Sequence, residues 1–455
     1  MCSSPLLPSQ EKKRIYIETL GCSKNRVDSE TMLNTLQFNG FDITTDPRIA
    51  EVIIVNTCAF LTKASEESIS RILDLSDFKI NGNCEKLIAT GCLTQRYKDS
   101  LFKEIPELDG LLGSNGFEKV PKLINSIYKG NFNSQIYLNK KPHYEHYEKL
   151  NEIKTTANHF AYLKIAEGCS NMCSFCNIPL LRGNFSSRTI NSITNEIIHL
   201  TKKGVKEINL ISQDTSSYGK DFKNNTGLED LLKCITNIEG DFWIRLFYCY
   251  PNTFESEVLQ IISNDKRFCR YLDMPLQHIN NSVLSAMNRK IDRKKIEKKI
   301  KEIETILPNA AWRTTFIVGF PNETEEAFKE LLEFVSEGHF HHVGIFMYSH
   351  EDNIRSAKFG DPIPNKLKRD RRNLLMEAQQ KISLQKNKEF IGKKLKVLVD
   401  GVSKETDLLI QSRSEFQGPD VDGIVYINEG NVDSGKFYNV EITEAYPYDL
   451  VGKIV

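Results

Sequence analysis

The chain has 455 residues, 26% of them charged and 40% hydrophobic, which is enough for about three domains of ~150 residues each. It has neither the run of about 18 apolar residues that a membrane helix needs nor the apolar segment of a signal peptide, so we expect a cytoplasmic protein without a membrane span. Sixty basic and sixty acidic residues cancel, which argues against a generic nucleic-acid binder but leaves a local basic face open.

The amino-terminal part alternates short apolar runs with amphipathic stretches, which predicts a small α/β sandwich with a parallel sheet over residues 12–135. Three of these runs, "RIYIETLGC", "EVIIVNTC" and "EKLIATGC", lead straight into Cys22, Cys58 and Cys92. Because the carboxyl ends of parallel strands share one edge of a sheet, we expect the three thiols to meet there.

Residues 138–158 are polar and without clear period, so we place a domain junction there. Six strand-like runs separated by helical patterns follow, which predicts a partial (β/α)6 barrel over residues 155–388, short of a complete (β/α)8 barrel. Polar or ring-bearing residues close almost every strand, at the barrel face that usually carries the chemistry. They include Gln213, Asp214, Tyr250, Gln277, His278 and Ser349.

Residues 365–390 form a charged helical stretch, whose basic run "KLKRDRR" we interpret as a solvated face, with contact to nucleic acid as the alternative. The tail consists of short alternating strands between Gly, Asp and Asn turns, which predicts a β-barrel of OB-like size over residues 389–455. The expected fold class is therefore α/β and multidomain, with a β-barrel at the carboxyl end.

The stretch "EGCSNMCSFCN" places Cys169, Cys173 and Cys176 within eight residues. In a reducing compartment clustered cysteines indicate metal ligands rather than disulfides. Zinc is a poor fit, because structural zinc sites close four ligands and no second cysteine pair follows at a suitable distance. A cubic iron-sulfur cluster on three thiolates fits better, since one iron keeps an open position for a substrate or cofactor.

The amino-terminal trio has the same number of thiols and predicts a second open cluster, with buried cysteines at strand ends as the alternative. The other five cysteines lack this pattern and are interpreted as core or incidental thiols, namely Cys2, Cys84, Cys234, Cys249 and Cys269.

The spacing C-x3-C-x2-C, with Phe175 just before the last cysteine, resembles the signature of the radical S-adenosylmethionine enzymes. That resemblance implies that the open iron chelates the amine and carboxylate of S-adenosylmethionine and that the reduced cluster splits the sulfonium into a radical. Gln213 and Asp214 would lie near the methionine part, and the backbone of Val318 and Gly319 under the adenine. Ordinary strand-end hydrogen bonding and helix entry are the alternatives for these residues.

The motifs "LGCSKNRVDSE", "VNTCAF", "TGCL", "EGCSNMCSFCNIPLLRG", "ISQDTSSYG", "MPLQH" and "TFIVGFPNETEE" together resemble the methylthiotransferases. The resemblance spans nearly the whole chain and implies a cluster domain, a radical barrel and a TRAM β-barrel. The G-C-x-K-N form at Cys22 and the "ISQDTSSYG" run look like the RimO branch, although Ser23 and "NIPLLRG" depart from its usual residues.

The RimO resemblance implies methylthiolation of the β-carbon of an aspartate in small-subunit ribosomal protein twelve. It also implies two [4Fe-4S] clusters, two molecules of S-adenosylmethionine, a donor such as flavodoxin or ferredoxin, and no catalytic residue beyond the cluster ligands. The alternatives are a MiaB-like enzyme acting on transfer RNA and a non-catalytic iron-sulfur carrier.

Two further features concern charge. Arg182 and Arg188 flank the cysteine loop and are candidates to bind a carboxylate, with pairing to a protein Glu as the alternative. From Ile391 to Val455 the tail carries eleven acidic and seven basic residues, a net charge of −4. An acidic barrel suits a basic protein better than a nucleic-acid backbone, so we expect it to attract the ribosomal protein and not to bind nucleic acid stably.

Overall fold

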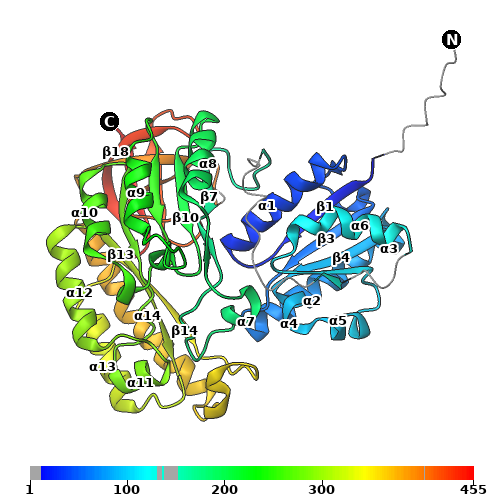
Figure 1. Ribbon diagram of the computed structural model, residues 1–455. Coiled ribbons are helices and arrows are strands. Elements are labelled where there is room, and N and C mark those ends of the chain that lie inside the picture. The colour runs from blue at the N-terminus through cyan, green and yellow to red at the C-terminus, as the bar shows by residue number, and fades with distance from the viewer. Residues whose placement is uncertain (1–11, 131–135, 138–151, 404) are drawn as a thin grey trace. The chain divides into compact units, whose positions relative to one another are not determined.

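The computed structural model describes residues 12–130, 136–137, 152–403 and 405–455 (Figure 1). They fold into two compact units: the first ends at Thr155 and also includes Leu180–Arg182, and the second is made of Thr156–Pro179 and Gly183–Val455. Residues 138–151, most of the predicted domain junction, lie outside the described residues. No helix within the described ranges is long and apolar enough to cross a membrane.

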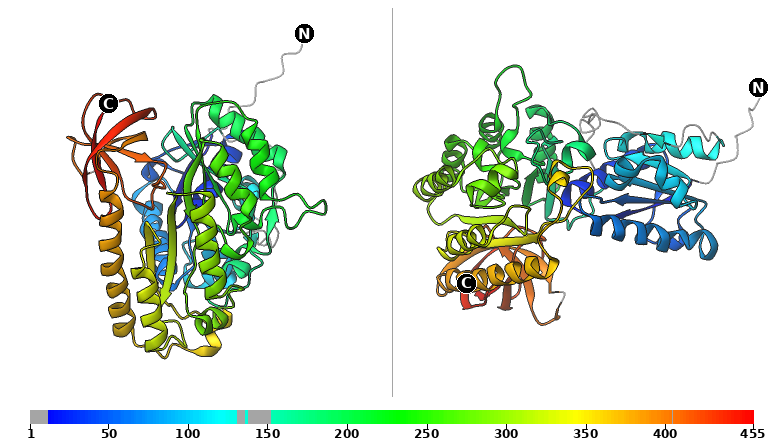
Figure 2. Two further views of the ribbon diagram at one scale, coloured as in Figure 1. Left: turned by 90° about the vertical axis from the view of Figure 1, so that its left-hand side faces the viewer. Right: turned by 90° about the horizontal axis from the view of Figure 1, so that it is seen from below.

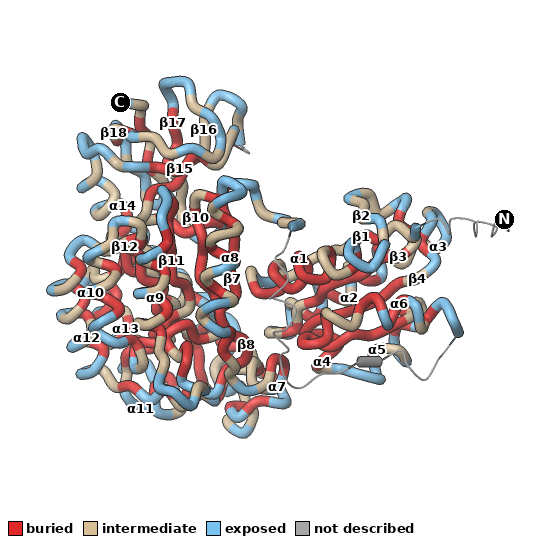
Figure 3. The backbone as a smooth tube through the Cα atoms, turned by 45° about the horizontal axis from the view of Figure 1, so that its top comes forward, coloured by how far each residue is buried: buried red, intermediate tan, exposed pale blue. Residues whose placement is uncertain are grey.

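The first unit is built on a parallel six-stranded sheet in the order β2-β1-β3-β4-β5-β6. The strands are β1 (Arg14–Thr19), β2 (Asp42–Ile43), β3 (Val52–Thr57), β4 (Lys86–Gly91), β5 (Gly110–Gly113) and β6 (Ile136–Tyr137). The central strand β3 is buried along its whole length, as expected for a parallel strand covered on both faces (Figure 3). The predicted α/β sandwich is confirmed.

Helices cover both faces of this sheet (Figure 1). Ile53 and Val55 of β3 belong to one apolar cluster with residues of α2, α4 and α5, whereas Ile54 points to the opposite face. The helices and 3-10 turns of this unit are α1 (Ser23–Phe38), η1 (Pro47–Ile49), α2 (Thr62–Ser76), α3 (Phe78–Asn81), α4 (Cys92–Tyr97), α5 (Asp99–Glu104), η2 (Phe117–Lys119) and α6 (Val120–Tyr128).

The second unit contains a parallel six-stranded sheet in the order β14-β13-β12-β11-β10-β7. Its strands are β7 (Phe160–Lys164), β10 (Glu207–Ile211), β11 (Trp243–Leu246), β12 (Phe268–Asp273), β13 (Ala311–Val318) and β14 (His342–Met347). These are the six strands predicted for a partial barrel. The sheet curves without closing, because β7 and β14 each pair with only one neighbour in it.

Amphipathic helices separate these strands and bury their apolar faces in one large core. Thr189, Asp292 and Thr324 cap α8, α12 and α13 by accepting a hydrogen bond from the backbone N–H three residues on. The main helices are α8 (Ile190–Lys202), α9 (Leu228–Thr236), α10 (Ser256–Asn264), α11 (Asn281–Ala286), α12 (Arg293–Ile306), α13 (Glu325–Ser336) and α14 (Asn365–Lys388). Shorter elements are β8 (Ala166–Glu167), α7 (Ile178–Arg182), β9 (Ser186–Ser187), η5 (Thr215–Ser217), η6 (Pro251–Thr253) and η7 (Arg355–Phe359).

The tail forms a closed barrel in the order β15-β16-β17-β19-β18, which confirms the prediction of a small β-barrel. Its strands are β15 (Lys394–Val402), β16 (Ile410–Ser414), β17 (Val425–Glu429), β18 (Phe437–Ala445) and β19 (Leu450–Ile454). Seven buried aliphatic residues fill it, namely Val397, Val399, Val425, Ile427, Val440, Ile442 and Leu450. Figure 2 shows this barrel at the end of α14.

The chain from Arg413 to Asp422, at the end of β16 and in the loop toward β17, lies against the larger sheet. It contacts one side chain from each of the six strands: Tyr162, Glu207, Arg245, Tyr271, Arg313 and His342. A side chain at Gly418 would collide with the Phe247 ring, 2.7 Å away. Glu207 and His342 are the first residues of β10 and β14, so at these two strands the small barrel packs against the amino ends.

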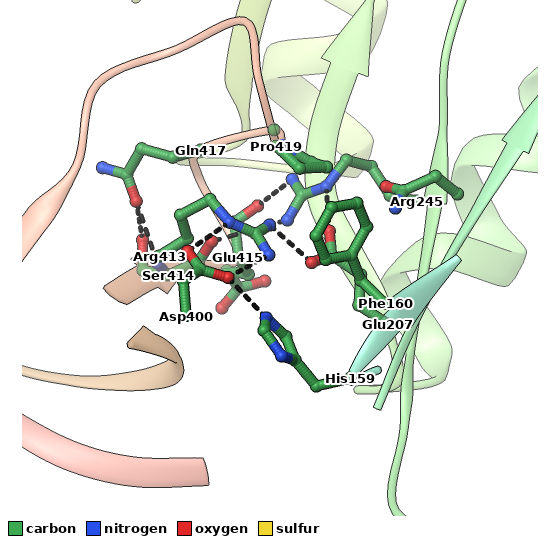
Figure 4. A network of polar contacts seen from close by, with 12 residues as sticks. His159, Phe160, Glu207, Arg245, Asp400, Arg413, Ser414, Glu415, Gln417 and Pro419 are labelled. Atoms are coloured by element: carbon green, nitrogen blue, oxygen red, sulfur yellow. Dashed lines mark hydrogen bonds and ion pairs between the residues drawn. The ribbon is translucent and has the colours of Figure 1, made fainter. Parts of the chain in front are cut away.

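A buried charge network joins the two barrels (Figure 4). Glu207 accepts from Arg245 at 2.8 Å and also from Arg413, and Arg413 makes a second, two-pronged pair with Asp400 at 2.8 and 2.9 Å. Asp400 also contacts His159 at 2.8 Å. Burial would raise the pKa of Asp400, but Arg413 and His159 hold it below its ordinary value. The carboxylate is therefore charged at neutral pH.

Replacing Arg413 by Met should destabilise the second unit by about 3–5 kcal/mol, because it removes the cation that faces two buried carboxylates. Urea unfolding followed by tryptophan fluorescence measures the change. Lys436→Met is the matched control, since Lys436 and its partner Asp433 are exposed and that pair should contribute nothing measurable. Equal stability of the two variants would contradict the structural role of the network.

Candidate functional site

Three cysteines of the first unit follow neighbouring strands at one edge of its sheet. Cys22 precedes α1, Cys58 follows β3, and Cys92 begins α4 directly after β4. The strands pair in register up to these points, with Thr19 opposite Asn56 and Thr57 opposite Gly91. The chains are so close that a Cβ at Gly21 would lie 2.8 Å from Cys58 Cβ. The structure therefore brings the predicted amino-terminal trio together.

The three thiols differ in exposure but interact electrostatically. Cys22 is exposed, Cys58 is half-buried and Cys92 is buried. Burial raises the pKa of Cys58, and Cys22 raises it further. Burial also raises the pKa of Cys92 to about 11, with contributions from Cys22 and Cys58 and an opposing effect of Arg182. A metal that bound Cys58 and Cys92 would therefore displace the protons of these two thiols.

Asn25 and Asn56 tie the strand ends below these thiols together. Asn25 donates through its side-chain amide to the carbonyls of Leu20 and Thr57, at 2.9 and 3.0 Å. Asn56 donates to the carbonyl of Asn25 and to Ser29 Oγ. The "CSKN" and "VNTC" motifs thus cross-link β1, α1 and β3 beside the cysteines.

Arg182 belongs to the first unit, although it follows Cys176 by only six residues in the sequence. Its guanidinium is buried, pairs with Asp28 at 2.6 Å and donates to Asn25 Oδ1. Arg188 is also buried and pairs with Glu196 at 2.8 Å. Both predicted carboxylate-binding arginines therefore hold carboxylates of the protein itself, and Arg182 places a positive charge next to the amino-terminal trio.

Cys169, Cys173 and Cys176 lie in one loop between β8 and α7. Burial, with a smaller contribution from the neighbouring thiols, raises the pKa of Cys169 to about 11 and that of Cys176 to about 12. The loop turns through positive φ at Gly168 (+79°) and Met172 (+57°), so the backbone reverses direction within the stretch that carries the three cysteines.

Backbone and side-chain bonds fasten this loop to the turn after α11. Ser174 donates through its N–H to the Met287 carbonyl at 2.9 Å and through its hydroxyl to the Ala286 carbonyl at 2.8 Å. Asn288 donates to the Met172 carbonyl at 2.8 Å. The position of the cysteines is thus set by a turn more than a hundred residues away in sequence.

Neither trio suits a single metal ion. In the part of the chain that the structure describes, no three His, Cys, Asp or Glu side chains converge on one ion. A cubic iron-sulfur cluster does not require such convergence, because each thiolate binds a different iron. Three thiols at each place supply three of the four ligands that a cubic cluster takes, and the assignment of a cluster to each trio stays a prediction.

Gln213 and Asp214, predicted to bind the cofactor, follow β10 and contact the cysteine loop. The Asp214 carboxylate accepts from Asn171 at 2.6 Å and from Ser216 and Ser217 at 2.7 Å, so it anchors the loop. Gln213 donates to Glu167, while its carbonyl oxygen is buried and accepts no hydrogen bond from any described group. That oxygen is an acceptor suited to the amine of a ligand.

Val318 ends β13, and Gly319 begins the turn before α13. Gly319 has φ +73° and donates its N–H to Glu323, and a side chain there would collide with Lys368. Phe175 packs on an apolar cluster that contains Phe320. These contacts fix the course of the turn, and the role of these residues in cofactor binding stays a prediction.

The sequence patterns did not indicate the buried ion pair between Glu323 and Arg371 that supports this turn. Glu323 lies 3.4 Å from His278 Nε2 and accepts from Arg371 of α14 at 2.9 Å. Arg371 and Lys368 belong to the "KLKRDRR" run, and both are buried inside the protein. The run is therefore only partly a solvated face, because two of its cations pair internally.

The five remaining cysteines include Cys84, Cys249 and Cys269, which are buried, and Cys234, which is half-buried. These four agree with their interpretation as core thiols. Cys2 lies outside the described residues.

Comparison with known proteins finds three family matches along the chain. Residues 14–113 match the uncharacterized protein family UPF0004, residues 163–335 the radical SAM superfamily and residues 391–455 the TRAM domain. A ribosomal protein uS12 methylthiotransferase RimO from Bdellovibrio bacteriovorus is 44% identical over 450 residues, which are 98% of each chain. The chain belongs to the RimO family. A second RimO relative, from Geotalea uraniireducens, is 42% identical over 98% of this chain and 99% of its own.

The predicted RimO resemblance is therefore confirmed, and the MiaB-like alternative has less support. The radical SAM match implies that this RimO-family chain uses S-adenosylmethionine and an iron-sulfur cluster.

Two solved structures share the fold at low identity. The radical S-adenosylmethionine methyltransferase TsrM from Kitasatospora setae has a TM-score of 0.56 at 12% identity, covering 76% of this chain and 77% of its own. The cobalamin-dependent enzyme OxsB has a TM-score of 0.52 at 10% identity, covering 81% and 56%.

Replacing Gly168 by Ala should displace the cysteine loop and reduce iron bound there several-fold, because the new Cβ would collide with the Asn184 and Gly183 carbonyls, the latter at 2.6 Å. Iron per chain after anaerobic reconstitution measures the loss. Gly204→Ala is the matched control, since Gly204 also has positive φ but has nothing within 4 Å of the added atom. Equal iron in both variants would show that the close approach at Gly168 does not position the loop.

Proposed function

We propose that this chain methylthiolates the β-carbon of an aspartate in ribosomal protein uS12, the small-subunit protein twelve of the sequence-based expectation. The observation that carries the proposal is a likeness to uS12 methylthiotransferases over 98% of the chain, which includes both cysteine trios. Two separate trios also match the chemistry, since the reaction must both activate a C–H bond and deliver sulfur.

We assign one [4Fe-4S] cluster to Cys22, Cys58 and Cys92 and a second to Cys169, Cys173 and Cys176. The second cluster, when bound with S-adenosylmethionine, supplies a radical that removes hydrogen from an unactivated carbon, a step outside the reach of side-chain acid-base groups. Two molecules of S-adenosylmethionine are needed, one for the radical and one for the methyl group. No side chain other than the cluster ligands is assigned a chemical step.

The protein's own residues then bind and orient the cofactor. Gln213 offers its buried carbonyl oxygen to the amine of S-adenosylmethionine, and Asp214 holds the cysteine loop in place. Val318 and Gly319 form the turn proposed to lie under the adenine, with Phe175 beside the cluster. An electron donor such as flavodoxin or ferredoxin and a cytoplasmic location complete the proposal, because the substrate is a ribosomal protein.

The tail is proposed to attract the protein substrate rather than nucleic acid. Asp400, Asp422 and Arg413 are taken up by contacts with the larger barrel. Glu415, Asp420 and Lys396 also make such contacts, and the rest of the tail sequence still contains seven acidic and five basic residues. This excess of negative charge favours a basic protein and opposes binding to a transfer-RNA backbone.

The decisive experiment supplies the reconstituted, reduced protein with S-adenosylmethionine, sulfide, and either uS12 or transfer RNA. Mass spectrometry should show a methylthio adduct on one aspartate of uS12 and none on transfer RNA. An adduct on transfer RNA alone would favour the MiaB-like alternative, and absence of S-adenosylmethionine cleavage would favour a non-catalytic iron-sulfur carrier.

Replacing Cys169, Cys173 and Cys176 together by Ala should leave about half the iron and abolish cleavage of S-adenosylmethionine, because one of two clusters is lost. Replacing Cys22, Cys58 and Cys92 should also remove about half the iron, but should spare cleavage and abolish sulfur transfer. Iron analysis and 5′-deoxyadenosine release measure both. Full iron after either replacement, or loss of cleavage after the second, would count against the two assignments.

The KM for uS12 should rise steeply with added salt, because screening weakens attraction between the acidic tail and the basic substrate. Reversing two exposed charges by Glu405→Lys with Asp407→Lys should raise KM at low salt, whereas Asp370→Lys on α14 should leave it unchanged. Two results together would contradict this role of the tail: transfer RNA competes with uS12 at physiological salt, and the KM for uS12 does not depend on salt.

A further inference from the structure

Arg289 is a buried arginine next to Cys169, Cys173 and Cys176. No sequence motif indicated this arginine. It lies in the turn between α11 and α12 and is only 9% exposed. This turn is also the one to which the cysteine loop is fastened, through Ser174 and Asn288. The position of Arg289 is thus coupled to that of the thiols.

Two contacts that do not involve the cysteines hold the guanidinium in place. Nη2 donates to the Pro275 carbonyl at 2.6 Å, and the guanidinium carbon lies 4.0 Å from the centre of the Tyr250 ring, a cation–π distance. The Tyr250 hydroxyl is itself fixed by the Lys290 N–H at 3.1 Å. With the group held in this way, Nη1 lies 3.7 Å from Cys173 Sγ, within hydrogen-bond range for sulfur.

Arg289 differs from every other buried arginine of the described chain in lacking a carboxylate partner. The other five each pair with Asp or Glu within 4 Å, namely Arg182, Arg188, Arg245, Arg371 and Arg413. The partners of Arg289 among the described residues are Cys173 Sγ, the Pro275 carbonyl and the Tyr250 ring, none of them a carboxylate, and its Nε is buried without an acceptor. A buried cation without a counter-charge is costly, so a negative group is expected to complete this site.

We propose that Arg289 is the counter-charge of the cluster on Cys169, Cys173 and Cys176, and that it eases reduction of that cluster by donating to the Cys173 sulfur. This inference rests on the cluster assignment under the proposed function. A cluster on three thiolates becomes more negative when it takes up an electron. A fixed positive charge and a hydrogen bond to sulfur stabilise that reduced state more than the oxidised one. Arg289 therefore places a positive charge beside the cluster and takes no part in making or breaking bonds.

The test measures the reduction potential of this cluster alone, without S-adenosylmethionine. The parent protein carries Cys22→Ala, Cys58→Ala and Cys92→Ala, so that one cluster remains. Arg289→Met removes the charge and the donors at similar volume. Lys290→Met is the matched control, because it removes one positive charge from the adjacent, exposed position.

At the midpoint potential of the parent, the ratio of reduced to oxidised cluster in an EPR-monitored titration should fall about tenfold in Arg289→Met. For a one-electron couple this is a shift of about 59 mV to more negative potential. Lys290→Met should leave the ratio unchanged. Arg289→Gln keeps a hydrogen-bond donor but removes the charge, so its cluster potential should also become more negative. This variant provides the test if Arg289→Met binds less iron than the parent protein.

An unchanged ratio in an iron-loaded variant would overturn the proposal. So would weaker binding of S-adenosylmethionine without a shift, since the Arg289 charge would then serve the carboxylate of the cofactor and not the cluster. A parent protein that holds no iron would refute the cluster assignment and this inference together, whereas a loaded parent with an unshifted variant refutes only the inference.

Discussion

Parallel, in-register pairing of strands is the constraint on which the rest of this structure depends. It brings the carboxyl ends of β1, β3 and β4 to one edge, and a cysteine follows each end, directly after β3 and β4 and three residues after β1. Thiols that stand 36 and 34 positions apart in the sequence therefore become neighbours. Glycines at positions 21 and 91 allow this approach, because a side chain at either would collide with the adjacent strand end.

The second unit uses the two ends of its parallel sheet for different purposes. The cysteine loop, Gln213 and the Gly319 turn all follow the carboxyl ends of strands, where the chemistry is proposed. The small barrel packs against the amino ends of β10 and β14 and contacts a side chain of all six strands. The small barrel is therefore an integral part of this unit and not a flexibly attached module. One consequence is that the charge of its sequence overstates the charge available to a partner.

Buried arginines mark both proposed cluster sites, but their surroundings differ. Arg182 faces Asp28 at 2.6 Å, so its positive charge near the first trio is largely compensated. Arg289 has a carbonyl and an aromatic ring as partners, neither of which carries a full negative charge. The two proposed cluster sites thus have different electrostatic environments, as expected if one delivers sulfur and the other accepts an electron to start a radical reaction.

The sequence by itself determined the six strands of the partial barrel, the small closed barrel, the family and the two groups of three cysteines. These features follow from short-range patterns, namely apolar periodicity and the spacing of residues within a single loop or strand end. Only the tertiary structure decided the roles of Arg182, Glu207, Arg289 and Arg413, whose partners lie up to 206 positions away. From the sequence alone, a charged residue is expected at the surface. Burying it requires a partner that the local sequence pattern cannot identify.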